Sequence, residues 1–593
     1  MHRALYSIVM DGIVTDTLAK AGAQRWLSAF SAALASRDRT RIASLFADEC
    51  YWRDILAFTW DLHTTTGAEA IVERLVPTLS KVAPKALQLA KGRTPPRSVT
   101  RAGTACIEAI FTFETVVGPC NGVVRLVSEG AEQRAWTLMT SLDEIRGHED
   151  PANGTRWQNV DWKRNFGGEN WADRRRRASA YADRDPAVLV VGAAQAGLMV
   201  AARLSMLGID TLAIDREKRL GDSWRRRYHA LTLHNETRVN HFPYMPFPRS
   251  WPVFIPKDML ANWFELYAEA MELNVWTGTE LKAASYDDKA KRWTVTLKRD
   301  DGRERTMHPR HVVFCNGVST IPKWPDLPGL KEFGGTVRHS GDYGSGLDWK
   351  GKRALVLGTG TSGHDVVQDL VVSGAADVSI IQNGPTLVVS LREAQAPYAL
   401  YDEDIPFEDC DLLATSFPYP VYEHSHKQIT VANAEADKVM LEGLRKRGFK
   451  LTSGPNGTGW QIMYGNRGGG YYFDAGCSQM IVDGRVRLLQ FADIDRFCAE
   501  GVRMKDGTVH AADLLVLATG YQGQKEAIRP LLGDAATDRI GPVWGFDEEG
   551  ELSGMWRPTG QPGLWFVAGG LAQCRLFSKV LALQIKAREL GIV

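Results

Sequence analysis

The sequence has few cysteines and none of the cysteine patterns that mark disulfide-bonded or zinc-binding proteins. Its 593 residues include eight cysteines, with no CxxC pair and no tight cluster. A disulfide framework or a structural zinc site is therefore not expected, and a reducing cytoplasm fits this cysteine usage best. No Ser–His–Asp arrangement and no constellation of metal ligands is found either.

Excess charge and long apolar runs are absent as well. The 71 basic and 70 acidic residues leave a formal charge of +1, which argues against nucleic acid or an anionic membrane as the main partner. No apolar stretch approaches the length that spans a bilayer. The N-terminal string MHRALYSIVMDGIV predicts a native start rather than a secretion signal, so we expect a cytoplasmic protein.

Two glycine-rich turns are the most informative feature that is present. GAAQAG at 192–197 follows the strand-like AVLVV and opens a helix through Leu207, and GTGTSG at 358–363 follows RALVL and opens a helix through Val372. Glycine permits the tight turn and lets backbone approach a pyrophosphate, which the helix N-terminus attracts. Two such turns imply two nucleotides, and one chemistry that needs both is the reduction of a flavin by a nicotinamide.

The first turn has two further features. Asp215 ends the next strand, TLAID, where an acid can accept hydrogen bonds from a ribose hydroxyl; a solvated strand end is the other interpretation. The middle position of the turn is Ala194, whose methyl group narrows the approach to the pyrophosphate. The first turn alone would be a weak signal, and the second makes it strong.

The chain is too long for one core, and its pattern changes along its length. A helix over 21–35 and strand-like runs at 50–55, 105–117, 122–129 and 134–145 predict an α+β unit with a curved antiparallel sheet. A polar stretch rich in Gly, Asn and Arg then reads as a linker, with Trp157, Trp162 and Trp171 packed along a surface and Arg174–Arg177 on a solvated helix face.

From residue 186 on the pattern is α/β. Strand patterns return at 485–490, 513–521 and 564–570 after an irregular segment at 384–480, and a closing helix is expected over 578–589. The second nucleotide unit therefore looks inserted into the first. The predicted parts are an α+β cone at 15–145, a linker at 146–185, an FAD-binding domain at 186–345 and 491–593, and an NAD(P)-binding domain at 346–490.

Further motifs carry a resemblance to a known family. FGGTVRHSGDY at 333–343 reads FxGxxxHxxxY, and it lies between CNG at 315–317 and the second turn. LGDSWRRRY at 220–228 and LATGY at 517–521 complete the ordered set. Residues 186–593 thus resemble the class B flavin-dependent monooxygenases, which include flavin-containing and Baeyer–Villiger monooxygenases.

The resemblance implies an α/β fold with two Rossmann-like dinucleotide-binding domains, and FAD with NADPH or NADH as cofactors. The nicotinamide would reduce the flavin, and O2 would add to the flavin C(4a) as a peroxide that oxygenates a small organic substrate. Ketones would undergo Baeyer–Villiger oxygen insertion, and sulfur or nitrogen compounds would be oxygenated at the heteroatom. The residues that this implies for cofactor binding are Gly192, Ala194, Gln195, Ala196, Gly197, Asp215, Arg216, Gly221, Asp222, Ser223, Trp224, Gly358, Gly360, Thr361, Ser362, Gly363, Asn383, Thr519 and Gly520.

The implied catalytic residues are less regular. His234 and Asn235, in LTLHNETR, both stand near the position at which the flavin-containing branch carries an active-site Asn, with a turn His bonded to backbone as the alternative. Arg392, in VVSLREAQAP, resembles the Baeyer–Villiger Arg that stabilises negative charge, with a surface salt bridge as an equal alternative. His339 and Tyr343 are expected between the domains, where they would shape the movement of the nicotinamide.

One departure concerns the coenzyme. The family often ends the second nucleotide unit with Gln-Arg, whose guanidinium grips the 2′-phosphate of NADPH, but here Gln382 is followed by Asn383. We therefore expect NADH to be accepted, unless a Lys or Arg from elsewhere substitutes.

The N-terminal unit resembles the nuclear-transport-factor-like (SnoaL-like), ketosteroid-isomerase-like cone of type II flavin monooxygenases. The resemblance implies a structural role, either packing on the oxygenase or forming a homodimer contact. The alternative is a second catalytic pocket with Asp54 or Asp61 as a base. For the whole chain, the alternatives are an NAD(P)H oxidase or reductase without oxygen transfer, and a cofactor-loaded ligand-binding protein.

Overall fold

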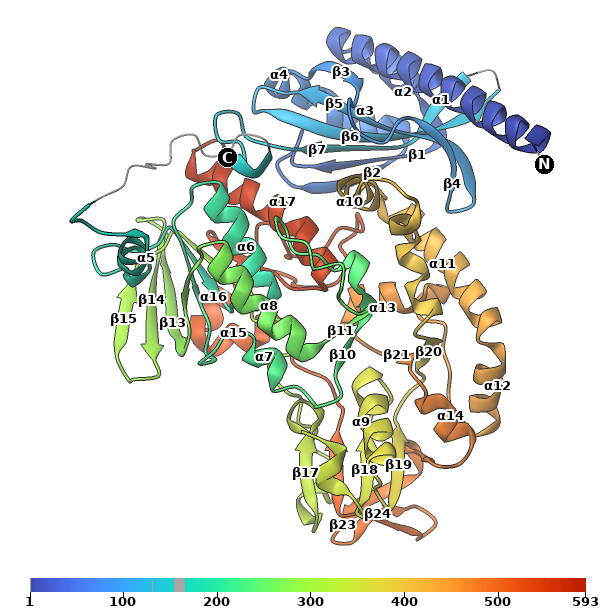
Figure 1. Cartoon of the computed structure of the whole chain (residues 1–593), viewed down its shortest axis with the longest axis vertical. Coiled ribbons are helices and arrows are strands. Elements are labelled where there is room, and N and C mark those ends of the chain that lie inside the picture. Colours follow the sequence, from blue (N-terminus) through green and yellow to red (C-terminus); the bar gives the residue numbers. More distant parts are fainter. Residues whose placement is uncertain (1, 131, 154–165) are drawn as a thin grey trace.

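The computed structural model describes residues 2–130, 132–153 and 166–593, with side chains from residue 17 on. Figure 1 shows an N-terminal unit with α1 lying along its sheet, a unit around α6 and α17, and a third unit around α9 beside a group of helices. The fold is mixed α/β. The expectations for Trp157 and Trp162 lie outside the described residues.

The N-terminal unit is one curved sheet covered by helices. The predicted helix is part of α1 (His2–Ser36), and the sheet has the order β2-β1-β7-β6-β5-β3, with β4 paired to β5. The long strands β5, β6 and β7 have central runs of buried residues, because one face packs on helices and much of the other packs on the rest of the protein. The strands are β1 (Phe46–Ile55), β2 (Leu62–Thr66), β3 (Lys85–Leu89), β4 (Arg97–Arg101), β5 (Thr104–Glu114), β6 (Pro119–Glu129) and β7 (Glu132–Leu142), and the shorter helices are α2 (Arg39–Ser44), α3 (Ala68–Leu75) and α4 (Leu79–Val82).

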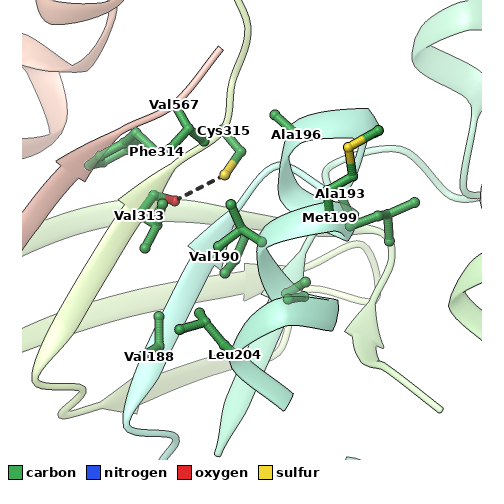
Figure 2. Packing of buried hydrophobic residues seen from close by; sticks show 14 of the residues in the cluster. Val188, Val190, Ala193, Ala196, Met199, Leu204, Val313, Phe314, Cys315 and Val567 are labelled. Atoms are coloured by element: carbon green, nitrogen blue, oxygen red, sulfur yellow. Dashed lines mark hydrogen bonds between the residues drawn. The ribbon is translucent and has the colours of Figure 1, made fainter. Parts of the chain in front are cut away.

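The first glycine-rich turn belongs to a five-stranded parallel sheet of order β12-β9-β8-β16-β27. β8 (Val188–Val191) and β16 (His311–Phe314) are buried on both faces, which explains their continuous apolar sequences. Figure 2 shows Val190 and Val313, neighbours in register, under the helix α6 (Gln195–Met206). The other strands are β9 (Thr211–Ile214), β12 (Asn274–Trp276) and β27 (Leu564–Phe566).

The closing helix α17 (Leu571–Glu589) begins earlier than the predicted 578, because its first residue directly follows Gly570 as N-cap. It serves two cores. Leu581 and Ile585 pack into the core of the parallel sheet, while Val580 and Leu583 pack into the core of the N-terminal unit. The N-terminal unit is therefore joined to the rest by a shared apolar helix.

The second turn belongs to another five-stranded parallel sheet, of order β17-β26-β18-β19-β22. Two of its strands, β17 (Thr336–His339) and β26 (Leu514–Leu517), lie outside the predicted boundaries of 346 and 490, which were too narrow. A parallel strand carries no signal of which sheet it joins, since both sheets consist of short apolar strands. The other elements are β18 (Arg353–Leu357), α9 (Thr361–Val372), β19 (Asp377–Gln382) and β22 (Arg487–Gln490).

The segment predicted to be irregular, 384–480, is largely helical. Each of its helices buries only a few residues along one side; for example, α11 (Tyr419–Ala436) has only Val421, His426 and Asn433 buried. The sequence therefore shows no clear helical period of apolar residues. The elements are β20 (Leu387–Ser390), the 3-10 helix η7 (Glu393–Asp402), α10 (Phe407–Thr415), α11, α12 (Lys438–Lys446), α13 (Gly459–Arg467), β21 (Tyr471–Asp474) and α14 (Cys477–Val482).

Small sheets and helices complete the chain. They are α5 (Trp171–Ala180), which lies in the predicted linker and carries Arg174–Arg177, α7 (Asp222–Arg225), β10 (Thr232–Glu236), β11 (Phe254–Pro256), α8 (Lys257–Ala270), β13 (Thr279–Asp287), β14 (Arg292–Arg299), β15 (Glu304–Met307), β23 (Ile494–Cys498), β24 (Gly501–Met504), β25 (Val509–Ala511), α15 (Gln524–Leu532) and α16 (Asp534–Arg539).

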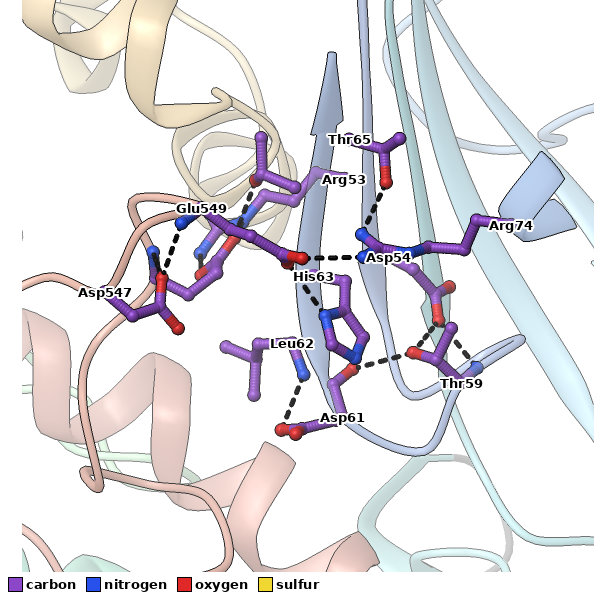
Figure 3. A network of polar contacts seen from close by, with 12 residues as sticks. Arg53, Asp54, Thr59, Asp61, Leu62, His63, Thr65, Arg74, Asp547 and Glu549 are labelled. Atoms are coloured by element: carbon purple, nitrogen blue, oxygen red, sulfur yellow. Dashed lines mark hydrogen bonds and ion pairs between the residues drawn. The ribbon is translucent and has the colours of Figure 1, made fainter. Parts of the chain in front are cut away.

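Ion pairs join the N-terminal unit to the loop at 543–557 (Figure 3). Arg53 forms a two-point contact with Glu551, with distances of 2.8 and 2.6 Å, and Glu549 accepts from Arg74 at 2.6 Å and contacts His63 at 2.8 Å. Such paired forks fix orientation as well as contributing attraction.

The two acids considered as a second catalytic base are both engaged. Asp54 is fully buried and accepts hydrogen bonds from Thr140 Oγ1 at 2.7 Å, from Thr59 Oγ1 at 2.7 Å and from the backbone of Phe58 and Thr59. Asp61 accepts both forks of Arg557 at 2.9 and 2.8 Å. Both carboxylates thus hold the loop and the interface together.

Candidate functional site

The two glycine-rich turns have the same construction. At both first positions the backbone is left-handed, with φ of 104° at Gly192 and 118° at Gly358. A Cβ there would lie 2.7 Å from the carbonyl oxygen of Cys315 in the first case and 2.4 Å from that of Ala518 in the second. Only glycine therefore lets each turn pass beside the end of the neighbouring strand.

The last glycines are equivalent too. A Cβ on Gly197 would lie 1.9 Å from the oxygen of Gly192, and one on Gly363 would lie 2.1 Å from the oxygen of Gly358. The helices α6 and α9 consequently approach their strands closely, as a dinucleotide cradle requires.

The middle positions differ from the first and last ones because neither needs to be a glycine. Ala194 and Gly360 are the N-caps of α6 and α9, both with extended backbone and neither with a side-chain cap. A Cβ at 360 would meet nothing nearer than the Tyr471 oxygen at 3.8 Å. Each helix N-terminus is thus open to an incoming anion, which fits a pyrophosphate.

Asp215 lies where a ribose could reach it. Its carboxylate accepts from the backbone N–H groups of Ala193 and Glu217, both at 2.9 Å, so it also fixes the first turn. Burial raises the pKa of Asp215 above its usual value. A desolvated carboxylate with remaining lone pairs is a suitable acceptor for hydroxyl groups.

Trp224, expected against the flavin region, donates to the Gln195 side chain at 3.1 Å and so contacts the first cradle. Gly221 has a φ of 86° where the chain passes close to Ala261 of α8. The other expected cofactor residues lie around the turns: Ala196, Asp222, Thr361 and Ser362 on the helices, Arg216 and Ser223 exposed beside the first cradle, and Thr519 and Gly520 in the loop after β26.

Asn383 is exposed immediately after β19, while Gln382 is buried and exchanges hydrogen bonds of 2.9 Å with the backbone of Lys450. The end of the strand that would bear the guanidinium in the family thus carries a neutral amide facing solvent. No positive charge stands at this position.

His339 and Tyr343 are both buried. His339 accepts from the Gly341 N–H at 3.1 Å through Nδ1, so its Nε2 is the atom that donates to the Gly520 oxygen, also at 3.1 Å. Tyr343 donates to Asp369 of α9 at 3.1 Å. In this arrangement His339 ties the end of β17 to the loop after β26, and burial lowers its pKa.

His234 and Asn235 lie on β10, and their side chains contact aromatic residues of the segment between positions 398 and 473. The His234 ring lies 5.3 Å from that of Phe473, and burial, with the nearby Arg227 charge, lowers the pKa of His234 to about 4. Asn235 Nδ2 donates to the Tyr398 hydroxyl at 2.8 Å. His234 is thus neutral at physiological pH, and Asn235 orients a phenol.

Arg392 is placed at the surface. Its side chain is 93% exposed and, among the described residues, forms an ion pair only with the neighbouring Glu393, at 3.5 Å. This is the arrangement of a surface salt bridge, and contact with a bound cofactor would need the side chain to move.

Tyr398, Tyr464 and Tyr471 come from three separate segments, and no sequence motif marks them. Arg227 is unmarked as well; it forms no ion pair with any described residue, although its charge affects the pKa values of His234, His339 and Asp365. Asp365 of α9 accepts from Tyr228 at 2.5 Å, which joins the two nucleotide units. Only the string WRRRY hinted at this region.

Other kinds of site are not found in the described part of the chain. No three His, Cys, Asp or Glu side chains gather as a metal site there, and none of its helices is long and apolar enough to cross a membrane. A surface cavity of about 250 Å³ opens beside Asp210 and Thr211, at the amino end of β9. Ligands of open α/β sheets bind at the opposite, carboxyl ends of the strands, where both cradles lie.

Comparison with known proteins agrees with the geometry. The model of the family described as "flavin-binding monooxygenase-like" matches residues 187–433. Indole-3-pyruvate monooxygenase YUCCA1 of Oryza sativa subsp. japonica is 30% identical over 353 residues, which cover 59% of this chain and 80% of the relative. The chain belongs to the flavin-binding monooxygenase-like family. An uncharacterized monooxygenase, y4iD of Sinorhizobium fredii, is 26% identical over a region that covers 56% of this chain and 53% of the relative.

Solved structures agree in fold. Cyclohexanone monooxygenase bound to ε-caprolactone has a TM-score of 0.50 at 18% identity, over 68% of this chain and 88% of that one. A complex of OTEMO with FAD and NADP has a TM-score of 0.51 at 17% identity, over 69% and 87%. The flavin-binding monooxygenase-like chain is thus a flavin monooxygenase with the α/β architecture of these enzymes.

Proposed function

We propose that this flavin monooxygenase binds FAD in the first cradle and NADH or NADPH in the second, and uses O2 to oxygenate a small organic molecule. The observation that carries the proposal is the equivalence of the two cradles, each with an open helix N-terminus at the carboxyl edge of its own parallel sheet. One carrier of electrons and one acceptor can then meet between the sheets.

The residues present fit these groups. Gly192 and Ala194 would admit the FAD pyrophosphate, and Asp215 would accept from a ribose hydroxyl. Gly358 and Gly360 would admit the nicotinamide coenzyme. When bound, the flavin accepts a hydride from the coenzyme and supplies the electrons that activate O2.

The chain's own residues would shape the space between the cofactors. His339 would hold the loop after β26 in place rather than transfer a proton, because both of its ring nitrogens are engaged. Asn235, with His234 beside it, would face the substrate from β10. For Arg392 we propose a role only on closure, when the exposed side chain could turn inward and stabilise negative charge.

We also propose that the N-terminal unit is a structural α+β cone of the SnoaL-like type, as in type II enzymes. Its ion pairs with Glu549, Glu551 and Arg557 and its sharing of α17 support packing on the oxygenase rather than an independent pocket. The engaged states of Asp54 and Asp61 support the same conclusion.

The test is single-turnover reduction and oxygen transfer on the purified yellow protein. NADH or NADPH should bleach the flavin without air, and air should then return the colour with one oxygenated product formed from a ketone or sulfide per coenzyme consumed. Stoichiometric H2O2 with no product would identify an oxidase, and bound FAD without bleaching would identify a binding protein. Either result would overturn the proposal.

The Asn383→Arg variant should acquire a preference for NADPH. A guanidinium at this exposed strand end would form charge-assisted hydrogen bonds to the 2′-phosphate. We expect the NADPH-to-NADH ratio of kcat/KM to rise about 10- to 100-fold. Asn383→Gln, which is neutral, is the matched control and should leave the ratio unchanged. An unchanged ratio in the Arg variant would show that the 2′-phosphate lies elsewhere.

A further inference from the structure

Three tyrosines lie close together beside the first parallel sheet. Tyr398 lies on η7, Tyr464 on α13 and Tyr471 on β21, and all three are only partly buried although packing around them raises their pKa values. The phenols are also close enough to one another to affect one another's pKa values: Tyr398 raises the pKa of both Tyr464 and Tyr471. Desolvated phenols that are still partly exposed can exchange hydrogen bonds with a bound small molecule.

This group of tyrosines adjoins the expected flavin position. The backbone N–H of Gly570, just beyond β27, lies near the Tyr464 phenol and lowers its pKa against the larger effect of burial, which raises it. β27 lies next to β16, which lies next to β8 and the first cradle. The phenols therefore stand at the carboxyl edge of the sheet that carries the first turn.

The walls between the phenols are aromatic. Trp460 lies 6.3 Å from Tyr398, 5.8 Å from Tyr471 and 4.7 Å from Phe473, measured between ring centroids. Trp544 packs edge-on against the Tyr464 ring, at 5.3 Å between ring centroids, and its Nε1 donates to the Tyr464 backbone carbonyl at 3.2 Å. The neutral His234 ring packs on Phe473, so this wall carries no charge.

Tyr398 differs from the others because its hydroxyl has a fixed orientation. Asn235 Nδ2 donates to its oxygen at 2.8 Å, and no described residue accepts its proton. Asn235 is itself held, because Asn240 donates to its backbone oxygen at 2.9 Å. With one lone pair occupied, the O–H of Tyr398 is directed away from Asn235 and left available.

A second link keeps η7 and β10 in register. The Gln395 amide donates to the His234 oxygen at 2.8 Å and to the Leu391 oxygen at 3.0 Å, while its carbonyl accepts from the Glu236 N–H at 3.3 Å. The Asn235–Tyr398 pair is therefore part of a rigid seam between two segments that are distant in sequence.

We propose that the Tyr398 hydroxyl donates a hydrogen bond to the carbonyl oxygen of the substrate, with Asn235 as its positioning residue, and that this pair selects carbonyl compounds over thioethers. The inference rests on the proposed function and deepens it. A carbonyl oxygen accepts such a bond strongly, whereas thioether sulfur accepts it weakly. The same bond withdraws electron density from the carbonyl carbon and favours attack at that carbon by an oxygen nucleophile.

The experiment compares two probes of similar shape, 4-phenyl-2-butanone and ethyl phenyl sulfide, on the FAD-loaded protein. Binding is measured by the change of the flavin absorbance, and turnover by product per coenzyme consumed. In Tyr398→Phe we expect the ketone Kd and KM to rise about tenfold and the sulfide values to change less than about twofold. FAD content and the rate of anaerobic reduction should stay unchanged.

Two further variants separate positioning from structure. Asn235→Leu should raise the ketone KM in the same direction by a smaller factor, and the double variant should lose little more than Tyr398→Phe alone. Tyr401→Phe is the matched control, since that phenol on the same helix donates to Asp411 at 2.7 Å instead. It should leave the ketone-to-sulfide ratio unchanged.

The outcomes are distinguishable. Equal changes for ketone and sulfide, no change for either, or a wild-type protein that does not bind the ketone would overturn the role of Tyr398. If the wild-type protein binds the ketone but forms no product from either probe, the proposed oxygen transfer fails, while the binding titration still decides the inference.

Discussion

Gly360→Asp is expected to abolish reduction of the flavin by NADH or NADPH while FAD stays bound. The new carboxylate would stand at the N-cap of α9, where it can accept from the helix's own free N–H groups. It would then fill the anion site with a negative charge and repel the coenzyme pyrophosphate. We expect kcat/KM for the coenzyme to fall by at least about 100-fold, which corresponds to roughly 3 kcal/mol of lost binding.

The fold should tolerate this change. Gly360 has a φ of −80°, which any residue adopts, and its Cβ would meet only the Tyr471 oxygen at 3.8 Å. An Asp N-cap stabilises a helix relative to an uncapped start. Gly358→Ala, in contrast, would require a left-handed Ala whose Cβ lies 2.4 Å from a backbone oxygen, and should unfold the unit.

The first cradle offers the mirror experiment. Ala194→Asp alters the equivalent N-cap of α6, which also has extended backbone, and should release FAD. Flavin content after gel filtration and stopped-flow bleaching by each coenzyme measure the two effects separately. Gly360→Ala adds only a methyl group and serves as the control. Retained reduction in Gly360→Asp would show that the second cradle does not hold the coenzyme.

The two cradles could be predicted from the sequence because their main determinants are local. A short apolar strand, a glycine pattern and a helix stand in one continuous stretch, and the clashes that require Gly197 and Gly363 arise within the turns themselves, with the oxygens of Gly192 and Gly358. The strands of the N-terminal unit were also legible, since β5, β6 and β7 follow one another and pair in order.

The substrate side could not be predicted in the same way. Asn235 and Tyr398 are 163 positions apart, and Gln395 helps to bring them together by joining η7 to β10. The assignment of strands to the two parallel sheets could not be predicted either, because β17 and β26 belong to the second sheet but lie outside its predicted residue range. Short buried strands and narrow helical stripes carry no signal about their partners.

The interface of the N-terminal unit could not be predicted from the sequence either, and Glu108 of β5 is one of its buried acids. The Glu108 side chain is 1% exposed and that of Arg125 is fully buried, with 2.8 Å between them. Arg97 and Arg101 contact Glu108 at 2.9 and 2.7 Å and also contact Glu403, which lies just after η7. The network therefore links the N-terminal core to the segment that bears Tyr398.

Glu108→Gln is expected to destabilise this unit by about 3–5 kcal/mol, because it leaves the fully buried Arg125 without its counter-charge. Urea unfolding followed by tryptophan fluorescence would report the lower midpoint. Glu132→Gln is the matched control: its carboxylate pairs with Arg134 at 3.1 Å but is 70% exposed, so the midpoint should not move. An unchanged midpoint in Glu108→Gln would show that the network contributes no net stability.

The same network predicts an acid dependence. Burial raises the pKa of Glu108, but the guanidinium groups of Arg125 and Arg101 lower it by a larger amount. The net result is a pKa of about 2, below the ordinary 4.5. Because the folded pKa lies below the unfolded one, this stabilisation is fully present above pH 4.5 and is lost as the pH falls toward 2. It amounts to about 3 kcal/mol at neutral pH. Between pH 5 and pH 3 the unfolding midpoint of the wild type should fall more steeply than that of Glu108→Gln, since the variant has no proton to bind at this position; parallel curves would contradict the assignment.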